Sequence, residues 1–337
     1  MAGPLPAVAA LRSAVRPRLA AVDTPVLAAC SGGADSLALA AALAFEGPRA
    51  GRPVGAVVVD HGLQPGSAER AERTAALLRE LGLAPVLVRT VQVGPDGGPE
   101  GAARDARYAA LRTAAAEHGA TVALGHTLDD QAETVLLGLA RGSGPRSVAG
   151  MVEHRPPFWR PLLGVRRETT RAACAAQGLP VWDDPWNTDP AYTRVRLRRE
   201  VLPLLEDVLG GGVAPALART AALLREDLDA LDELAAAESA RLDGAAELPA
   251  AAVADLPAAL RRRVVRSWLR DAGVPDLQAV HLRAVDALLT AWRGQGRVDL
   301  PGGQGVLRAS GRLRVLPAPD AGNAAIRTDQ PPEEPRP

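Results

Sequence analysis

Six residues near the N-terminus, Ser31 to Ser36 (SGGADS), have the composition of an anion site. They lie between two apolar runs, so they are predicted to join a strand to a helix. Glycines let the backbone approach a phosphate closely, and the first N–H groups of a helix have no intrahelical partner. The two serines add hydroxyl donors, and Asp35 is a candidate ligand for a metal ion bound to the phosphates. The alternative is that this stretch is an ordinary capped turn between a strand and a helix, without a binding role.

A second polar stretch, Asp60-His61, ends a valine-rich run that begins at Val54. Polar side chains at the carboxyl end of a buried strand are well placed to edge a nucleotide pocket. The alternative is that they only end the strand before the next helix, which Ser67 would cap.

A third stretch, GHTLDDQAET at 125–134, contains two carboxylates three residues apart. Thr127 can cap the helix that follows, with Asp130 as its capping-box partner. The spacing puts Asp130 and Glu133 on one helix face, where they could hold Mg²⁺ or bind and deprotonate an amine. Alternatively, they only complement the helix dipole.

Alternating strands and helices are predicted to position these three stretches. Strands are expected at 26–30, 54–60, 85–93 and 121–125, and helices at 11–21, 37–45, 67–81, 102–118 and 128–139. This order favours an α/β fold with a doubly wound, mainly parallel sheet, in which ligands bind beyond the carboxyl ends of the strands.

A smaller, mainly helical domain is predicted to follow. Residues 1–190 form the α/β domain, 191–213 a basic connecting helix and 214–320 the helical domain, with long helices and a closing hairpin over 298–316. The polar, proline-rich residues 321–337 are expected to be a disordered tail.

The composition limits the chemistry. The 337 residues contain no lysine and have a formal net charge of zero, so no lysine Schiff base or Walker lysine is available and anions must be bound by arginine. The two cysteines, Cys30 and Cys174, form no CxxC pair for a zinc ribbon or an iron–sulfur cluster. No signal peptide or twenty-residue apolar span is evident, so a cytoplasmic protein that does not contact a membrane is expected.

Arginines gather at the junction between the two domains, where a phosphate backbone could bind. Such a run can equally be a solvated helix face. The members of this run are Arg194, Arg196, Arg198 and Arg199.

Taken together, these motifs resemble those of the tRNA(Ile)-lysidine synthetases, a family of PP-loop ATP pyrophosphatases. The matches are SGGADS at 31–36, DHGLQPGS at 60–67, AARDARYAAL at 102–111, GHTLDDQAETVLLGLARGSG at 125–144, WRPLL at 159–163, NTD at 187–189 and TRVRLRREVLPLL at 193–205. A weaker match over 256–313 resembles the family's helical substrate-binding domain.

The resemblance implies a two-step ligation. ATP would adenylate the C2 carbonyl oxygen of the wobble cytidine in the CAU-anticodon isoleucine tRNA with release of pyrophosphate. Free L-lysine would then attack C2 through its side-chain amine and expel AMP to form lysidine. Mg²⁺ and a homodimer are compatible with this scheme.

The resemblance also implies roles for single residues. Asp35, Asp130 and Glu133 would be catalytic, Asp130 and Glu133 would bind lysine, and Asp35 would bind Mg²⁺. The ATP-binding residues would be Ser31, Gly32, Gly33, Ala34, Asp35, Ser36, Asp60, His61, Gly125 and His126. The tRNA-binding residues would be Arg104, Arg107, Arg194, Arg196 and Arg198.

Two positions depart from the family pattern, because Thr127 replaces a common histidine and Val195 a common asparagine. Three other functions stay open at this stage. A PP-loop tRNA thiolase would need cysteine pairs that the chain lacks. A small-molecule amidating synthetase would leave the arginine run without a function. A non-catalytic tRNA- or nucleotide-binding protein would bind its ligand without releasing pyrophosphate.

Overall fold

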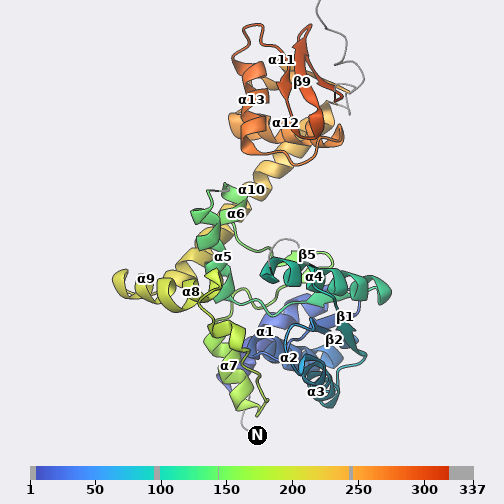
Figure 1. Cartoon of the computed structure of the whole chain (residues 1–337), viewed down its shortest axis with the longest axis vertical. Helices are drawn as coiled ribbons and strands as arrows, with labels where there is room; N and C mark the ends of the chain where they lie inside the picture. The colour runs from blue at the N-terminus through green and yellow to red at the C-terminus, as the bar shows by residue number, and fades with distance from the viewer. Residues whose placement is uncertain (1–4, 95–98, 143, 243–245, 319–337) are drawn as a thin grey trace, which may run out of the picture. The chain divides into compact units, whose positions relative to one another are not determined.

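The computed structural model describes residues 5–94, 99–142, 144–242 and 246–318 (Figure 1). The chain divides into two compact units, residues 1–225 and 226–337, which are described separately. The division falls within one long helix, α10 (Val213–Arg241). The tail expected over 321–337 lies outside the described residues.

A six-stranded sheet forms the centre of the first unit, in the order β3-β2-β1-β4-β6-β5. All neighbouring strands are parallel except β5 and β6, so the predicted mainly parallel α/β fold is confirmed. The strands are β1 (Val26–Ala29), β2 (Val54–Asp60), β3 (Val86–Thr90), β4 (Thr121–Ala123), β5 (His154–Arg155) and β6 (Phe158–Trp159).

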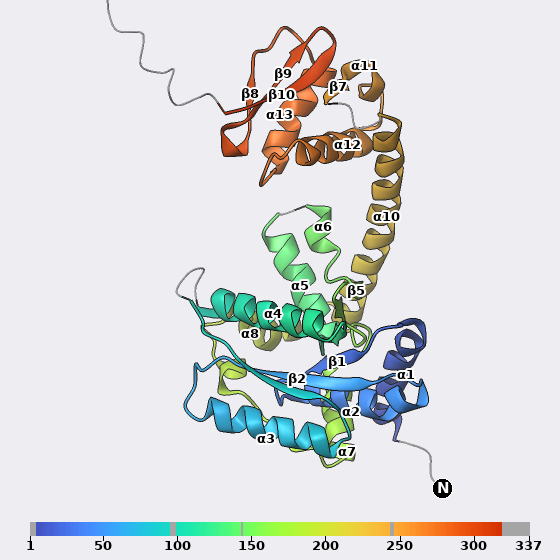
Figure 2. The same ribbon diagram turned by 90° about the vertical axis from the view of Figure 1, so that its right-hand side faces the viewer.

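Alternating residues of each central strand enter two separate cores. Val26 and Ala28 of β1 pack in the core that contains α1, α2, α3 and α7, whereas Leu27 packs with α4 on the opposite face. Figure 2 shows α4 on one side of β1 and β2, and α2 and α3 on the other. Both faces of the sheet are therefore covered, as is typical of parallel sheets.

The helices of the first unit are α1 (Pro6–Ala21), α2 (Ala34–Arg49), α3 (Ser67–Glu80), α4 (Pro99–Glu117), α5 (Leu128–Ala140), α6 (Pro145–Val148), α7 (Arg167–Ala176), α8 (Thr193–Arg196) and α9 (Leu202–Val208). Helices α1 to α5 overlap the predicted ranges, whereas α6 and α7 lie where the sequence predicts no helix. A π-helical segment, Leu197–Val201, joins α8 to α9, where a single connecting helix over 191–213 is expected from the sequence.

The second unit contains the end of α10, three further helices and a small sheet. The helices are α11 (Ala250–Val253), α12 (Ala258–Asp271) and α13 (Ala279–Thr290). The antiparallel sheet has the order β7-β10-β9-β8, with β7 (Glu247–Pro249), β8 (Val298–Asp299), β9 (Gly305–Ala309) and β10 (Arg312–Leu316). The predicted smaller, mainly helical domain is confirmed, although its closing hairpin belongs to a four-stranded sheet.

One arginine is buried in this second unit. Arg261 donates to Asp286 over 2.6 Å and to the Leu256 carbonyl over the same distance. The pair is 10% and 8% exposed, so its charge is neutralised inside the unit. Arg261 is therefore a structural residue here.

No single helix in the described part of the chain is long and apolar enough to cross a membrane. One pair of helices bent by 94°, Thr193–Val208 and Val213–Arg241, meets the criteria of length and composition when the two are taken together.

Candidate active site

The glycine turn lies between the end of β1 and the first residue of α2, as predicted. Gly32 has a φ of 85°, a left-handed conformation that favours glycine, and Gly33 is the N-cap of α2. The Ser36 hydroxyl donates to the Gly33 carbonyl (2.9 Å) and accepts from the backbone N–H of Ser31 (3.2 Å). Ser36 thus fixes the shape of the turn at which a phosphate could bind.

Gly125 brings the carboxyl end of β4 against the first turn of α2. A Cβ at this position would lie 2.9 Å from the Asp35 carbonyl oxygen and 3.1 Å from the Ser36 Cα. Both neighbours are backbone atoms, which cannot give way cheaply. Glycine is therefore required here by the packing of two elements that carry site residues.

The start of α5 forms the predicted capping box. The Asp130 carboxylate accepts from the backbone N–H (2.8 Å) and the hydroxyl (3.0 Å) of Thr127, whose Oγ1 in turn accepts from the Asp130 N–H (3.4 Å). These bonds aim Asp130 toward the edge of the sheet and hold it there. Thr127 therefore orients a candidate catalytic carboxylate.

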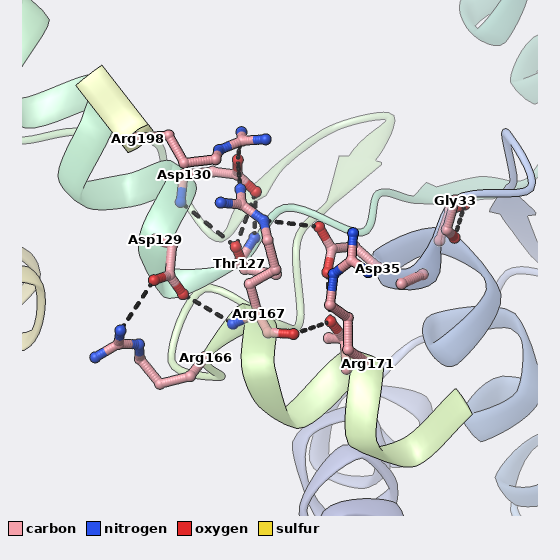
Figure 3. A network of polar contacts seen from close by, with 12 residues as sticks. Gly33, Asp35, Thr127, Asp129, Asp130, Arg166, Arg167, Arg171 and Arg198 are labelled. Atoms are coloured by element: carbon pink, nitrogen blue, oxygen red, sulfur yellow. Dashed lines mark hydrogen bonds and ion pairs between the residues drawn. The ribbon is translucent and has the colours of Figure 1, made fainter. Parts of the chain in front are cut away.

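Arg167, the first residue of α7, joins three candidate carboxylates (Figure 3). Its Nε lies 3.3 Å from Asp35, one terminal nitrogen lies 3.4 Å from Glu133, and the other donates to Asp130. Asp35 also accepts from the Thr170 hydroxyl. The three carboxylates predicted to be catalytic are thus brought together, although they come from two separate helices.

Glu133 is completely buried and surrounded by arginines. Arg198 donates to it through Nε over 2.8 Å, and a nitrogen of Arg194 lies 3.7 Å away. Arg198 also approaches Asp130 (3.5 Å). A buried carboxylate is stable only when its charge is compensated, and these guanidiniums supply that compensation.

The electrostatics distinguish the carboxylates from one another. Burial raises the pKa of Asp35 and outweighs the opposing effect of its contacts with Thr170 and Arg167. Burial would also raise the pKa of Asp130, but Arg167 and the Thr127 N–H hold it below its usual value. Asp130 therefore binds a cation well and is a weak base, whereas Asp35 is the more basic group.

A second group of site residues lies where β2 and β4 end, beside α4. Burial lowers the pKa of His126 to about 3, and the neighbouring arginines act in the same direction, so the imidazole is neutral at pH 7. Burial and Arg107 likewise lower the pKa of His61. The Nδ1 atoms of both histidines and the buried Tyr108 hydroxyl have no hydrogen-bond partner within the described ranges. Such atoms are available to a bound ligand.

The other predicted site residues are less closely grouped. Asp60 is buried and accepts from the Gly62 N–H (3.0 Å) within its own turn. Arg104 is exposed and Arg107 half-buried, both beside Tyr108. Arg196 pairs with Glu200 (3.0 Å) on the surface, whereas Arg194 and Arg198 reach Glu133.

The sequence motifs do not single out Arg166 or Arg167. In the structure, Arg166 lies 3.2 Å from Asp129, and the backbone N–H of Arg167 donates to the same carboxylate (2.8 Å). One signal could have identified them. Several carboxylates predicted at one site need cations, and an arginine pair at the start of a helix is a natural source.

A nucleotide-binding α/β fold with this glycine turn and without a Walker lysine is typical of the PP-loop ATP pyrophosphatases. The chain is a member of this class. The family model described as a PP-loop domain matches residues 9–205, more than half of the chain. A second model, the TilS substrate binding domain, matches residues 248–314.

Curated relatives identify the particular family. The tRNA(Ile)-lysidine synthase of Streptomyces coelicolor is 59% identical over 297 residues, which cover 86% of this chain and 84% of the relative. That of Thermobifida fusca is 54% identical, with 94% and 99% covered. The chain belongs to the tRNA(Ile)-lysidine synthase family. It is an enzyme of that type, and the predicted ATP-dependent formation of lysidine on tRNA is confirmed over the alternatives.

A solved structure supports the fold. The U34-tRNA thiolase NcsA from Methanococcus maripaludis, with its [4Fe-4S] cluster, aligns with a TM-score of 0.53 at 19% identity, covering 65% of this chain and 80% of that chain. At this identity the likeness concerns the fold alone.

Proposed function

We propose that this enzyme adenylates the C2 carbonyl oxygen of the wobble cytidine in the CAU-anticodon isoleucine tRNA. The side-chain amine of free L-lysine then attacks C2, and AMP leaves with that oxygen. The observation that carries the proposal is that Asp35, Asp130 and Glu133 all contact the guanidinium of Arg167, at the starts of the helices that follow β1 and β4. A phosphate turn and cation-binding carboxylates are what the two steps require.

In the first step the turn from Ser31 to Ser36 would bind the phosphates that leave as pyrophosphate. Backbone N–H groups at a helix start, fixed in advance by Gly32 and the Ser36 hydroxyl, can stabilise charge as it develops on the leaving group. His61, His126, Asp60 and Gly125 would form the rest of the nucleotide pocket, with the free Nδ1 atoms as polar contacts.

Asp35 fits a magnesium site that is shared with phosphates. Its side chain is 25% exposed and lies in the first turn of α2, near the end of the phosphate turn. No cluster of three metal-binding side chains occurs among the described residues, and Mg²⁺ commonly takes only one or two carboxylates beside substrate phosphates. When bound, Mg²⁺ would neutralise charge on the triphosphate.

In the second step Asp130 and Glu133 would receive the lysine side chain. The Thr127 N–H bonds to the Asp130 carboxylate (2.8 Å) and favours its ionised form, so Asp130 can hold an ammonium group. Glu133 is fully buried, and it would act together with the arginines that surround it.

The tRNA would be held by guanidiniums around the site. Arg194 and Arg198 are about one-third exposed, and Arg196 is largely exposed, so all three can reach a phosphate backbone. Arg104 and Arg107 would approach the anticodon beside His61 and Tyr108. A homodimer is also part of the proposal, and light scattering of the purified chain tests it.

The residue assignments are tested by replacing Asp35 with asparagine, which keeps the size of the side chain. We expect tRNA-dependent ATP–pyrophosphate exchange to be lost, while tRNA affinity in filter binding changes by less than about twofold. Asp23→Asn is the matched control, because Asp23 is 96% exposed and pairs only with Arg52 on the surface. Normal exchange by the Asp35 variant would contradict the assignment.

A further inference from the structure

Arg167 occupies the carboxylates that the proposed function assigns to the substrate lysine. Its side chain is 17% exposed, and its guanidinium contacts Asp130 (Figure 3) and also Glu133. A lysine ammonium also seeks carboxylates through N–H donors. Within this structure, the site is therefore filled by an internal cation.

The charges around this point are balanced. In the described part of the chain, four carboxylates meet four guanidiniums, and the members are Asp35, Asp129, Asp130 and Glu133 with Arg166, Arg167, Arg194 and Arg198. A further cation would find no uncompensated anion there. Lysine can bind only if one of the guanidiniums leaves its carboxylates or if negative charge is added.

Arg167 is the arginine best placed to leave. It is the one joined to Asp35, the acidic residue of the phosphate turn, with its Nε 3.3 Å from that carboxylate. The triphosphate of ATP would bring several negative charges to this turn, and guanidinium binds phosphate bidentately. Arg198, by contrast, is bonded to Glu133 over 2.8 Å and, among the described residues, makes no ion pair with Asp35.

Only the side chain of Arg167 would have to move. Its backbone N–H is held by Asp129 (2.8 Å), and its carbonyl lies 2.7 Å from the Thr170 hydroxyl, whose single proton it shares with Asp35. The first turn of α7 is therefore fixed while the guanidinium is carried on a long, rotatable stem. A side-chain rotation of this kind needs no rearrangement of the fold.

We propose that Arg167 is a placeholder for the substrate lysine, which holds the lysine carboxylates until nucleotide phosphate draws its guanidinium away. This inference rests on the proposed function and adds an order of binding to it. Lysine is excluded from the enzyme without nucleotide and is admitted once the phosphate turn is filled. Arg167 also contributes to the binding of ATP.

The test measures lysine affinity by equilibrium dialysis with labelled lysine, with and without an ATP analogue that has a methylene group between the α and β phosphates. For the unaltered protein, the analogue should tighten lysine binding by about tenfold or more, the size expected when competition by a partly buried ion pair is removed. This arm needs no variant, so it does not depend on whether a substituted protein folds.

The second arm uses Arg167→Gln. Without nucleotide, this variant should bind lysine about tenfold more tightly than the unaltered protein, and the analogue should then add little. Its KM for ATP in pyrophosphate exchange should rise. Arg171→Gln is the matched control one turn further along α7, because Arg171 is 58% exposed and pairs with Asp183. A merely structural role for Arg167 would lower the melting temperature without tightening lysine binding.

Equal lysine affinity with and without the analogue would overturn the placeholder role. If the unaltered protein still incorporates lysine into tRNA in that case, the proposed function stands and only the order of binding is wrong. If it incorporates no lysine at all, the proposed function itself fails, and the placeholder role fails with it.

Discussion

Replacing Gly125 with alanine tests whether the site depends on the close approach of β4 to α2. The new Cβ would lie 2.9 Å from the Asp35 carbonyl oxygen and 3.0 Å from its carbonyl carbon, whereas ordinary contacts lie at 3.4–4 Å. The two backbones must therefore separate by about half an ångström, and overpacking of this kind costs about 1–3 kcal/mol.

Two measurable changes should result from Gly125→Ala. The melting temperature should fall by about 2–12 °C, given the usual shift of about 2–4 °C per kcal/mol for a unit of this size. Because Asp35 is displaced, kcat for pyrophosphate exchange should fall by about 10- to 100-fold. Gly164→Ala is the matched control, since Gly164 has no positive φ and no atom within 4 Å of an added Cβ.

The opposite pattern would refute this reasoning. If Gly125→Ala left the melting temperature and kcat unchanged and raised only the KM for ATP, glycine would be needed for the approach of the nucleotide. The packing of β4 against α2 would then not be the reason for its presence.

Three further predictions follow from the charges of the site. Glu133→Gln leaves the charge of Arg198 and its neighbours uncompensated. The free energy of unfolding in denaturant titrations should therefore fall by about 2 kcal/mol. An unchanged midpoint of the denaturant titration would contradict the structural role of the Glu133 charge. The pKa of His126 is about 3 in the folded state and about 6.5 in the unfolded state. Between these two pH values the unfolded state binds more protons, so the free energy of unfolding falls as the pH decreases from about 6.5. The unaltered protein should therefore lose up to about 1.4 kcal/mol more per pH unit than His126→Asn in this range, and parallel pH profiles would contradict it. Finally, neutralising Arg194, Arg196 and Arg198 together should weaken tRNA binding and flatten its dependence on salt. Unchanged binding would indicate that these arginines only form a solvated helix face.

Local patterns predicted the parts of the fold with long, regular signals. The valine-rich run from Val54 to Asp60 became β2 with the same bounds, and the capping box of Thr127 and Asp130 marks the start of α5. Both features depend on neighbouring residues alone, so the sequence contains what is needed to find them.

Short strands escaped prediction because they carry no periodicity. β5 and β6 have two residues each, too few to show alternation, and they are stabilised by pairing at the edge of the sheet. The closing hairpin expected over 298–316 is present, as the antiparallel strands β8, β9 and β10. A short helical turn at Pro301–Gly303 joins β8 to β9 there, and the turn between β9 and β10 lies at Ser310 and Gly311, both with positive φ.

The candidate site depended on contacts between distant residues. Arg167 lies 132 residues from Asp35 in the chain, and no local pattern connects them. The different environments of the arginines in the connecting helix could, however, have been predicted from the sequence. Arg194 and Arg198 are four residues apart and share a helix face, whereas Arg196 lies between them and must point elsewhere.

The most direct test of the central claim counts two products of one reaction. The purified protein, ATP, Mg²⁺ and labelled lysine are incubated with a CAU-anticodon isoleucine tRNA transcript, or with a methionine tRNA as control, and pyrophosphate and tRNA-bound lysine are measured together. We expect one pyrophosphate for each lysine incorporated into the isoleucine tRNA, and no incorporation into the control. Release of orthophosphate in place of pyrophosphate, or pyrophosphate release with no lysine transferred, would contradict the account.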